Sequence, residues 1–243
     1  MRVKPLSIVT ATFNVVRHIE QYCQSVGQLD PEKFDWIVID GNSTDGTAEY
    51  LEKQKERFSY YESAPDSGFY HALNKGIGRV TTPYYMVFGA DDRPSSDLLE
   101  QVMPLLSENP ALVLGAVRLM PPGRIKRPRH RRFHAIGWGQ VVSHHSVGTV
   151  IRTNVHEKFG YYDTRFQLLA DGLLLKRILA SSERIVAVNS VFGEFQLGGM
   201  TSGDKMRSAV EAFLIQVKEG SNGLLQLFLL NLRVIRNLVS GRK

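Results

Sequence analysis

The sequence predicts an α/β protein with a Rossmann-like, mostly parallel central sheet and helices on both faces. The first observation is an alternation of strand and helix patterns up to residue 106, which is typical of parallel strands joined by crossover helices. The second is that small, polar and acidic residues follow each strand, where open sheets of this kind bind ligands. The length of 243 residues and the 43% hydrophobic content suit a soluble protein with a sizeable core.

The individual elements follow from apolar runs and helical periodicity. Short runs rich in β-branched and aromatic residues predict strands at Leu6–Thr10, Trp36–Ile39, Tyr60–Ser63 and Tyr84–Phe88. Longer amphipathic segments predict helices at Arg17–Leu29, Thr47–Phe58, Phe69–Arg79 and Ser96–Leu106. The leucine-rich stretch Gly223–Ser240 predicts a C-terminal amphipathic helix with an apolar face formed by Leu225, Phe228, Leu232, Ile235 and Val239.

The single cysteine, Cys23, has the spacing of an inward-facing helix residue, so we expect a packed thiol and not a nucleophile. One cysteine forms no internal disulfide, and the N-terminal residues show no secretory signal pattern. We therefore expect a cytoplasmic protein.

The net charge of +6 is concentrated in one segment, Arg124–Arg132, which holds six Lys/Arg and no acidic residue. Neighbouring Pro121, Pro122, Gly123 and Pro128 predict that it is a loop. A solvated loop and a surface for phosphate groups of nucleic acid, lipid or a diphosphate ligand are both compatible with this composition.

Several nucleotide and metal sites are excluded by their motifs. No G-x-G-x-x-G follows a strand, no G-x-x-x-x-G-K-[ST] occurs, and no Cys/His cluster has zinc-ligand spacing. Dinucleotide-binding, P-loop and zinc proteins are therefore not supported.

Adjacent carboxylates, Asp91 and Asp92, directly follow the buried strand at Tyr84–Phe88. Two such charges repel, and neither is buried cheaply unless a cation or water compensates it. One loop of small, polar and acidic residues would be ordinary turn chemistry, but such residues follow four successive strands. The sequence therefore predicts a ligand site at this edge of the sheet.

Taken in order, these segments resemble family-2 glycosyltransferases, enzymes of the GT-A fold that use nucleotide-diphosphate sugars. The segments that carry the resemblance are LSIVTATFN, WIVIDGNSTDGT, SAPDSGFYHALNKGIGRVTTPY, GADD, SHHSVGTVIR, LLADGLLLKRIL and FQLGGMTSG. They extend from residue 6 to about 203, and they are most similar to the subgroup that builds bacterial exopolysaccharides such as colanic acid. The resemblance implies a donor-binding half at 1–115, an acceptor-binding half at 116–205 and a helical tail at 206–243.

The resemblance implies that Asp91 and Asp92 lie at the donor diphosphate. Asp92 would bind a divalent Mn²⁺ or Mg²⁺, and Asp91 would lie nearer the ribose or the metal's waters. Carboxylate and phosphate oxygens suit such hard cations, which neutralise a departing nucleoside diphosphate. An aspartate turn capping the helix from Ser96 would account for one of the two carboxylates but hardly for both.

The remaining donor contacts are also implied by the resemblance. Base and ribose would be recognised by Asp40 and Asp66, whereas Asp45 has the position of a helix cap. Other residues expected around the nucleotide are Thr10, Thr12, Asn14, Asn74 and Lys75. Lys75 would meet a phosphate, although a solvated lysine on a helix is the competing interpretation.

Asp171 matches the position of the family's catalytic base, although it could instead cap the helix that follows. A carboxylate opposite the departing phosphate would deprotonate the acceptor, and in-line displacement would invert the anomeric centre. Ala170 stands where many relatives have a second acid, and the Q-x-x-R-W motif of processive synthases is absent, which favours transfer of one sugar per encounter. On the acceptor side the resemblance implies His144, His145, Gly198 and Gly199, with His145 standing where relatives often have Gln.

The expected donor is a nucleotide-diphosphate sugar, with UDP favoured over GDP by family habit, and the expected acceptor is a glycan or a polyprenyl-diphosphate-linked glycan. The tail is too interrupted to span a bilayer, since its longest apolar run is Leu227–Leu230. A helix docked on the protein's own core or in a dimer and a helix lying in a membrane interface both fit the pattern. Together with the basic segment, we expect peripheral contact with an anionic membrane. The oligomeric state is left open.

Two other classes fit less well. A sugar nucleotidyltransferase would need a glycine-rich, basic loop directly after the first strand, and TATFNVVRH lacks one. A nucleic-acid-binding module could use Arg124–Arg132, but that segment has no interleaved aromatic residues, and acidic strand ends would repel a phosphate backbone. We therefore expect no nucleic-acid partner.

Overall fold

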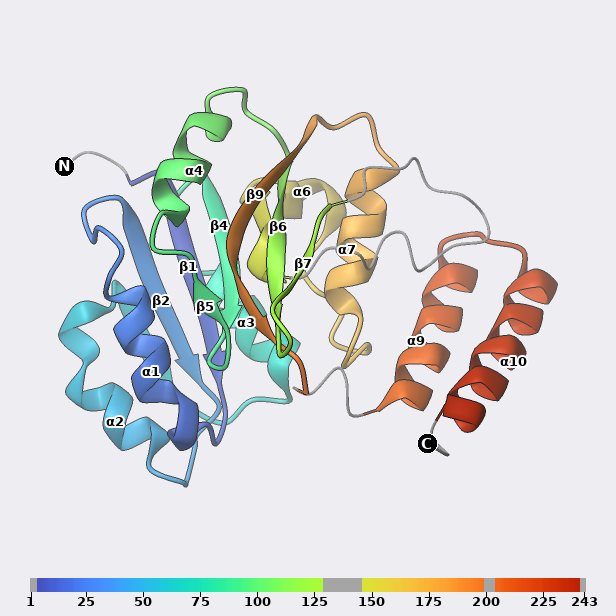
Figure 1. Cartoon of the computed structure of the whole chain (residues 1–243), viewed down its shortest axis with the longest axis horizontal. Helices are drawn as coiled ribbons and strands as arrows, with labels where there is room; N and C mark the ends of the chain where they lie inside the picture. The colour runs from blue at the N-terminus through green and yellow to red at the C-terminus, as the bar shows by residue number, and fades with distance from the viewer. Residues whose placement is uncertain (1–3, 129–145, 199–203, 241–243) are drawn as a thin grey trace.

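The computed structural model describes residues 4–128, 146–198 and 204–240, and it confirms the predicted α/β class. A central sheet lies between two helical layers, and a pair of antiparallel helices lies at one end of the molecule (Figure 1).

The sheet is parallel in one half and mixed in the other. Its strand order is β3-β2-β1-β4-β8-β6-β9-β5, with β7 paired to β6. The strand bounds are β1 Leu6–Thr12, β2 Phe34–Asp40, β3 Tyr60–Ser63, β4 Tyr84–Gly89, β5 Arg93–Pro94, β6 Leu112–Met120, β7 Arg124–Lys126, β8 Thr149–Arg152 and β9 Ile185–Gln196. The strands β3, β2, β1 and β4 are all parallel, so their carboxyl ends open on one edge. Strand β8 runs antiparallel to both β4 and β6.

Two hydrophobic cores lie on opposite faces of the sheet, because alternate strand residues point to opposite sides. Ile8 packs with residues of α1 and α4 on one face, and Val9 packs with residues of α3 and α7 on the other. The helix bounds are α1 Val16–Val26, α2 Thr47–Lys53, α3 Phe69–Ile77, α4 Leu98–Leu106, α6 Val155–Phe159, α7 Ala170–Leu179, α9 Lys205–Lys218 and α10 Gly223–Ser240. Cys23 is fully buried in the first core, as predicted.

Several element boundaries differ from the prediction. Strand β1 continues to Thr12, two residues beyond the expected end. Helix α1 ends at Val26, and the helix expected over 47–58 ends at Lys53 and is followed by a short 3₁₀ turn. The chain leaves the helix there because Phe58 has to reach the sheet, where its ring packs edge-on against Trp36 with centroids 4.8 Å apart.

The prediction of a loop over the basic segment was wrong for its first three residues. Arg124–Lys126 form β7, which pairs antiparallel with residues 117–119 of β6. The turn between the strands is tight because Gly123 adopts a φ of 88°, a conformation that glycine accepts without strain. Residues 129–132 of the segment lie outside the described residues.

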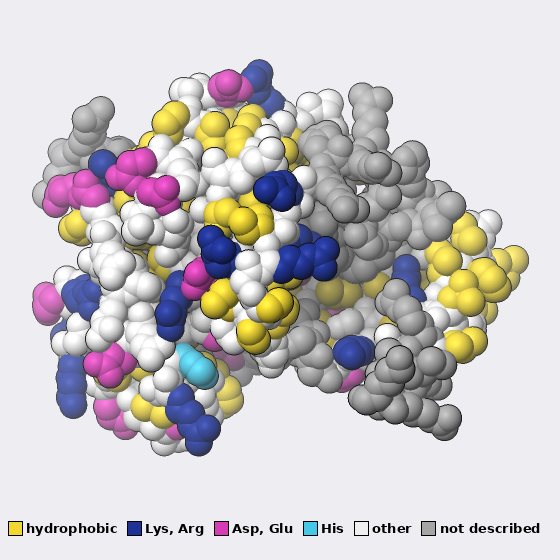
Figure 2. All heavy atoms as spheres, in the orientation of Figure 1, with side chains coloured by type: hydrophobic (Ala, Val, Ile, Leu, Met, Phe, Trp, Pro, Cys, Tyr) yellow, Lys and Arg dark blue, Asp and Glu magenta, His cyan; other side chains and the backbone are white. Residues whose placement is uncertain are grey.

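The predicted C-terminal helix is confirmed as α10, and its apolar face is exposed. It lies outermost, against α9, which separates it from the rest of the molecule (Figure 1). The polar residue Gln226 is 1% exposed, whereas Phe228 of the apolar face is 61% exposed. Docking of the apolar face on the protein's own core is therefore wrong for the described residues, and Figure 2 shows hydrophobic side chains gathered over this helix. Among the described residues no helix is long and apolar enough to cross a membrane.

Candidate active site

The end of β1, the loop after β2 and the end of β3 are joined by one buried carboxylate, that of Asp40. It accepts hydrogen bonds from the Thr12 hydroxyl at 2.9 Å and the Ser63 hydroxyl at 2.7 Å. It also accepts bonds from the backbone N–H and the hydroxyl of Ser43, at 2.9 and 2.6 Å. These four hydrogen bonds offset the cost of burying the carboxylate. Asp40 and Thr12 therefore organise the wall of the site in this structure.

Asn14 and Asp45 connect the loops that follow β1 and β2, nearer the surface than Asp40. Asn14 adopts a φ of 51°, and its side-chain oxygen accepts the N–H of Thr44 at 2.9 Å. Asp45 accepts the N–H groups of Val16 and Thr47, each at 3.0 Å, and so satisfies donors at the starts of α1 and α2. Gly46, and not Asp45, is the N-cap residue of α2, so Asp45 satisfies the first N–H group of this helix from one residue before the cap position.

Thr10 points into the core and not toward this rim. Its hydroxyl is fully buried, 2.5 Å from the Tyr22 hydroxyl, and accepts the indole N–H of Trp36 at 3.2 Å. This placement follows from the strand's extension to Thr12, which keeps Thr10 within the sheet.

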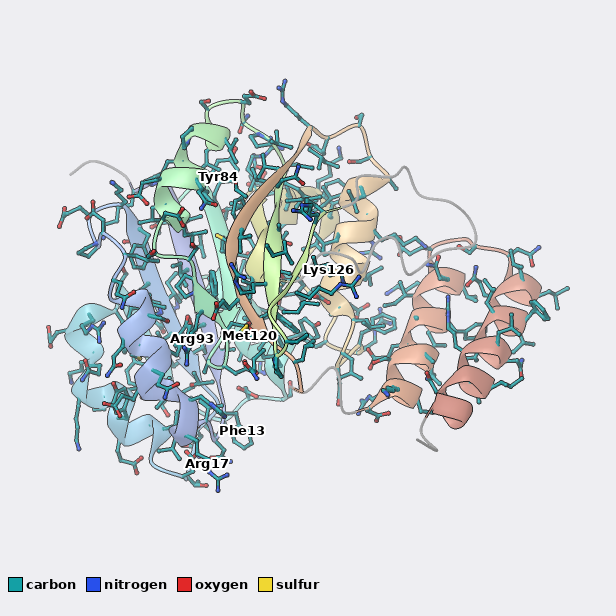
Figure 3. The ribbon with its side chains drawn as sticks, viewed as in Figure 1. Phe13, Arg17, Tyr84, Arg93, Met120 and Lys126 are labelled. Atoms are coloured by element: carbon teal, nitrogen blue, oxygen red, sulfur yellow. The ribbon has the colours of Figure 1, made fainter. Side chains whose placement is uncertain are left out.

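An aromatic ring that sequence reasoning missed lies at the end of β1. Phe13 is 63% exposed (Figure 3). Its ring and the carboxylate of Asp66, which follows β3, both lie next to Gly41. A Cβ on Gly41 would lie 2.8 Å from Asp66 Oδ2 and 3.2 Å from Phe13 Cδ2, so a larger residue here would displace these two side chains. Asp66 Oδ1 accepts the N–H of Gly68 at 2.7 Å. The available signal was a large apolar residue among polar loop residues, directly after a strand.

Asp91 and Asp92 converge beside Gly89 at the end of β4. A Cβ on Gly89 would lie 2.7 Å from Asp91 Oδ1 and 3.2 Å from Asp92 Oδ2. Asp92 is 4% exposed and accepts the N–H groups of Gly89 at 3.1 Å and Gln196 at 3.2 Å. Burial and the neighbouring Asp91 carboxylate raise the pKa of Asp92 to about 8. Such a pair fits a divalent cation, which would relieve both the burial cost and the repulsion.

A metal at this point would have few protein ligands. Among the described residues no three His, Cys, Asp or Glu side chains gather as a ligand cluster. A cation held by one or two carboxylates and completed by phosphate oxygens and water is typical of nucleotide-binding magnesium sites. The donor set therefore fits the predicted cation.

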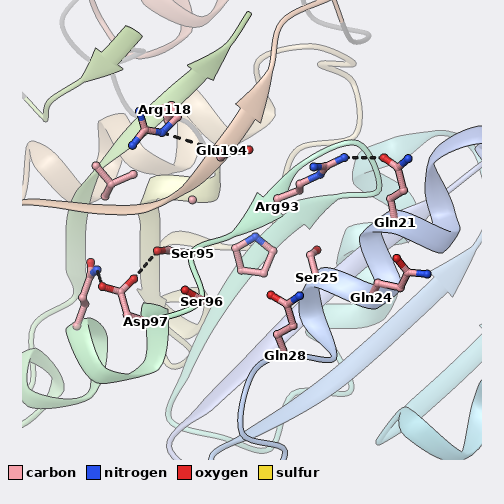
Figure 4. Close-up of a pocket in the computed structure, with 14 residues that line it drawn as sticks. Gln21, Gln24, Ser25, Gln28, Arg93, Ser95, Ser96, Asp97, Arg118 and Glu194 are labelled. Atoms are coloured by element: carbon pink, nitrogen blue, oxygen red, sulfur yellow. Dashed lines mark hydrogen bonds and ion pairs between the residues drawn. The ribbon is translucent and has the colours of Figure 1, made fainter. Parts of the chain in front are cut away.

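Arg93, although adjacent to the acidic pair, turns away from it. Its guanidinium donates to Gln21 of α1 at 2.6 Å, on the wall of a polar cavity of about 740 Å³ (Figure 4). The cavity lies between α1, β5 and the start of α4, and its other wall residues include Gln24, Gln28 and Asp97.

Asp171 lies in the first turn of α7 and is held by a tyrosine from α3. Its Oδ1 accepts the Tyr70 hydroxyl at 2.8 Å and the N–H of Gly172 at 2.7 Å. Burial raises the pKa of Asp171, and these hydrogen bonds act against that rise. The N-cap position of α7 is Leu169, so Asp171 is not the helix cap that the sequence left open.

Asn74 and Lys75 are bonded to protein partners. The Asn74 amide pairs with the backbone of Tyr162, donating at 2.8 Å and accepting at 3.1 Å. Lys75 forms an ion pair with Glu62 at 2.7 Å, so it is neither bound at the acidic pair nor simply solvated. Both residues fix α3 to its neighbours.

Of the residues predicted for the acceptor side, Gly198 follows β9 with a φ of 106° and open space where a side chain would stand. It is two residues beyond Gln196, whose N–H reaches Asp92, so this turn lies next to the acidic pair. His144, His145 and Gly199 lie outside the described residues.

A half-parallel sheet with acidic loops at one edge, continued by antiparallel strands, is the architecture of GT-A glycosyltransferases, and the solved structures agree. The S. aureus TarS fragment 1–349 superposes with a TM-score of 0.68 at 15% identity, covering 91% of this chain and 68% of that one. The mannosyltransferase PcManGT of Pyrobaculum calidifontis, solved with GDP-Man and Mn²⁺, gives a TM-score of 0.69 at 18% identity, covering 94% and 68%.

The chain belongs to glycosyl transferase family 2, whose sequence profile matches residues 7–171. An uncharacterised glycosyltransferase of Mycobacterium tuberculosis is 30% identical over 206 residues, covering 81% of this chain and 77% of the relative. A PGL/p-HBAD biosynthesis glycosyltransferase of Mycobacterium bovis is 25% identical over 172 residues, covering 68% and 66%. The predicted family, fold and enzyme class are thereby confirmed.

Proposed function

We propose that this glycosyltransferase moves a single sugar, with inversion, from a nucleotide-diphosphate sugar to a hydroxyl of a glycan or polyprenyl-diphosphate-linked acceptor in cell-surface polysaccharide synthesis. The observation that carries the proposal is the division of the acidic residues. Asp91 and Asp92 face one point at the end of β4, and Asp171 stands separately on α7. The paired carboxylates of Asp91 and Asp92 suit cation binding, and the separate carboxylate of Asp171 suits the role of base.

The donor proposal rests on the rim of the sheet. The exposed Phe13 ring offers a stacking surface for the base, and the neighbouring Asp66 offers an acceptor for ribose hydroxyls or a base N–H. Related folds support a nucleotide-sugar donor, since TarS has been solved with UDP and with UDP-GlcNAc, and PcManGT with GDP-Man. UDP is the favoured nucleotide.

Asp92 and Asp91 would hold Mn²⁺ or Mg²⁺ at the diphosphate. When bound, such a cation neutralises charge that develops on the departing nucleoside diphosphate. The raised pKa of Asp92 agrees with this role, because a buried carboxylate next to another one ionises readily only when a positive charge accompanies it.

Asp171 would act as the base. The hydrogen bonds from Tyr70 and Gly172 both reach Oδ1, which leaves Oδ2 to accept the proton of the acceptor hydroxyl. As that proton moves to Asp171, the acceptor oxygen bonds to the anomeric carbon, and the bond from this carbon to the phosphate oxygen breaks. The nucleoside diphosphate leaves with the bonding electron pair, and attack from the opposite face inverts the centre. Burial favours the reaction, since a carboxylate of raised pKa is a stronger base.

The test is a screen of UDP-, GDP- and dTDP-sugars for nucleotide release, with and without Mn²⁺. Asp171→Asn should abolish turnover and still bind donor, whereas Asp92→Ala should lose Mn²⁺-dependent donor binding. Asp30→Asn is a matched control, because this carboxylate pairs with Lys33 ahead of the start of β2 and contacts neither group. Turnover retained by Asp171→Asn would remove the assigned base.

We also propose that α10 lies on an anionic membrane, next to a lipid-linked acceptor. Its exposed apolar residues include Leu224, Phe228 and Ile235, while Gln226 is turned inward. Residues 205–243 carry seven Lys/Arg against two Glu, and Arg124, Lys126 and Arg127 add positive charge. An exposed apolar face accompanied by basic residues fits an anionic lipid interface better than a neutral protein surface.

The membrane proposal is tested with vesicles of phosphatidylglycerol and of phosphatidylcholine at low salt. We expect binding to the first and not to the second, and Phe228→Glu should abolish it. Tyr161→Glu introduces the same change at another exposed aromatic residue and should bind like the wild type. Failure of the wild type to bind, or dimers that dissociate upon Phe228→Glu, would refute the lipid assignment.

A further inference from the structure

A buried carboxylate from the C-terminal helices holds the chain segment that leads to Asp171. Glu211 of α9 is 5% exposed. Its Oε1 accepts the N–H of Gln167 at 3.0 Å, and its Oε2 accepts the N–H groups of Leu168 at 2.9 Å and Leu169 at 3.1 Å. Three consecutive backbone donors thus converge on one side chain that is more than 40 residues distant in the sequence.

The position of this carboxylate explains why it is stable when buried. Leu169 is the N-cap of α7, where the first N–H groups of the helix lack partners and the helix dipole favours negative charge. Arg207, one turn earlier on α9, donates to Glu211 Oε1 at 3.3 Å and supplies a compensating charge. The backbone of 167–169 therefore depends on Glu211, and Glu211 depends on that backbone for its own hydrogen bonds.

Tyr70 of α3 contacts both this segment and the proposed base, Asp171. The Tyr70 hydroxyl lies 3.1 Å from the carbonyl oxygen of Leu168 and 2.8 Å from Asp171 Oδ1. Asp171 follows Leu169 by two residues. Its carboxylate is thus oriented between α3, through Tyr70, and α9, through the backbone that Glu211 holds.

We infer that Glu211 is a positioning residue for Asp171, so that docking of the C-terminal helices completes the catalytic geometry. The inference rests on the proposed role of Asp171. Glu211 does not touch the reacting atoms. It fixes the turn from which α7 starts, and small displacements of a reacting group reduce rates steeply.

The interface between α9 and α7 offers a matched control at its other end. Glu219 accepts two hydrogen bonds from Arg177, at 3.1 and 2.8 Å, near the C-terminal end of α7. Glu211→Gln and Glu219→Gln each remove one charge that joins the tail to α7. Only the first one alters the segment before Asp171.

The experiment measures steady-state nucleotide release from the best donor of the screen, donor affinity, and hydrogen exchange over residues 165–173. We expect Glu211→Gln to lower kcat roughly 10- to 100-fold with donor affinity unchanged. Exchange at 167–169 should rise. Glu219→Gln should retain the wild-type kcat and the wild-type exchange of this segment, even if both variants melt earlier.

The pH profile gives a readout that simple loss of stability would not produce. Among the described residues, the titratable groups that face Asp171 are Tyr70, Tyr162 and Glu211, with Arg207 beside Glu211. Burial is the main cause of the raised pKa of Asp171, and the Glu211 charge adds to it. Glu211→Gln should therefore move the acid limb of kcat to lower pH while lowering its plateau.

Asp171→Asn is measured in parallel. If it keeps turnover, the proposed base and the role of Glu211 are both wrong. If it is inactive but Glu211→Gln matches Glu219→Gln in kcat and exchange, only the inference on Glu211 is overturned. Should Glu211→Gln fail to fold, Glu211→Asp against Glu219→Asp provides the same comparison, since a shorter side chain cannot reach all three N–H groups.

Discussion

Replacing Tyr70 by Phe tests the geometry around Asp171 most directly. The change deletes one buried hydroxyl that lies 2.8 Å from Asp171 Oδ1 and 3.1 Å from the carbonyl oxygen of Leu168, and it leaves the ring in place. A hydrogen bond to a charged group contributes about 1.5–3 kcal/mol. We therefore expect the free energy of unfolding to fall by about that amount at neutral pH.

The same change has a definite sign in the pH profile. Burial raises the pKa of Asp171, and the Tyr70 hydroxyl opposes this because it donates to the ionised form. Without the hydroxyl the pKa rises further. A base must be ionised to act, so the acid limb of kcat should move to higher pH, and the variant should lose most activity at low pH.

The assay is nucleotide release across pH at saturating donor. Tyr60→Phe is the matched control, because Tyr60 also donates to a carboxylate, that of Glu62 at 2.8 Å, but on β3 and away from Asp171. Its profile should overlay the wild type. An acid limb of Tyr70→Phe that stays in place or moves to lower pH would refute this account of the base.

Three further predictions concern the rim and the two cores. Phe13→Ala should weaken UDP binding in calorimetry by roughly 5- to 150-fold, since stacking of a base on an aromatic ring contributes about 1–3 kcal/mol; an unchanged affinity would mean that the base lies elsewhere. Gly76→Ala should lower the free energy of unfolding by about 1–3 kcal/mol, because the new Cβ would lie 2.7 Å from Val9 Cγ1. Gly78→Ala is the control and should have little effect, since its Cβ would lie 3.4 Å from its nearest neighbours. Equal melting curves for the two variants would contradict this packing. Cys23, whose pKa burial raises to about 11, should not react with a thiol reagent at pH 8 until the protein is unfolded in urea, and rapid modification of the native protein would contradict its burial.

Much of the donor-side fold is determined by short-range patterns. The alternation of apolar runs and amphipathic segments predicted the first four strands and their helices, because periods of 2.0 and 3.6 residues are imposed by backbone geometry. The acidic pair at Asp91 and Asp92 was recognisable for a similar reason, since adjacent carboxylates after a buried strand are costly without compensation. The helix boundaries were less predictable, because Phe58 leaves its helix to meet Trp36.

The sequence did not predict which hydrogen-bond partners each polar side chain finds within the protein. Asp40 and Asp66 look alike in the sequence, yet Asp40 accepts hydrogen bonds from Thr12 of β1, Ser63 of β3 and Ser43 of the loop after β2. Asn74 is engaged by the backbone of Tyr162, 88 residues away. Such pairings depend on which strand ends become neighbours, and the residue spacing along the chain does not encode that directly.

The sequence by itself determined the family, the parallel half of the sheet and the positions of the carboxylates along the chain, because each rests on local periodicity or on an ordered set of motifs. The tertiary structure alone decided that Tyr70 donates to Asp171, that Glu211 holds the backbone ahead of Asp171, and that α10 turns its apolar face outward. The physical reason is range. Propensity and periodicity act over a few residues, whereas a buried hydrogen bond or an exposed helix face depends on which distant segments the packed cores bring together.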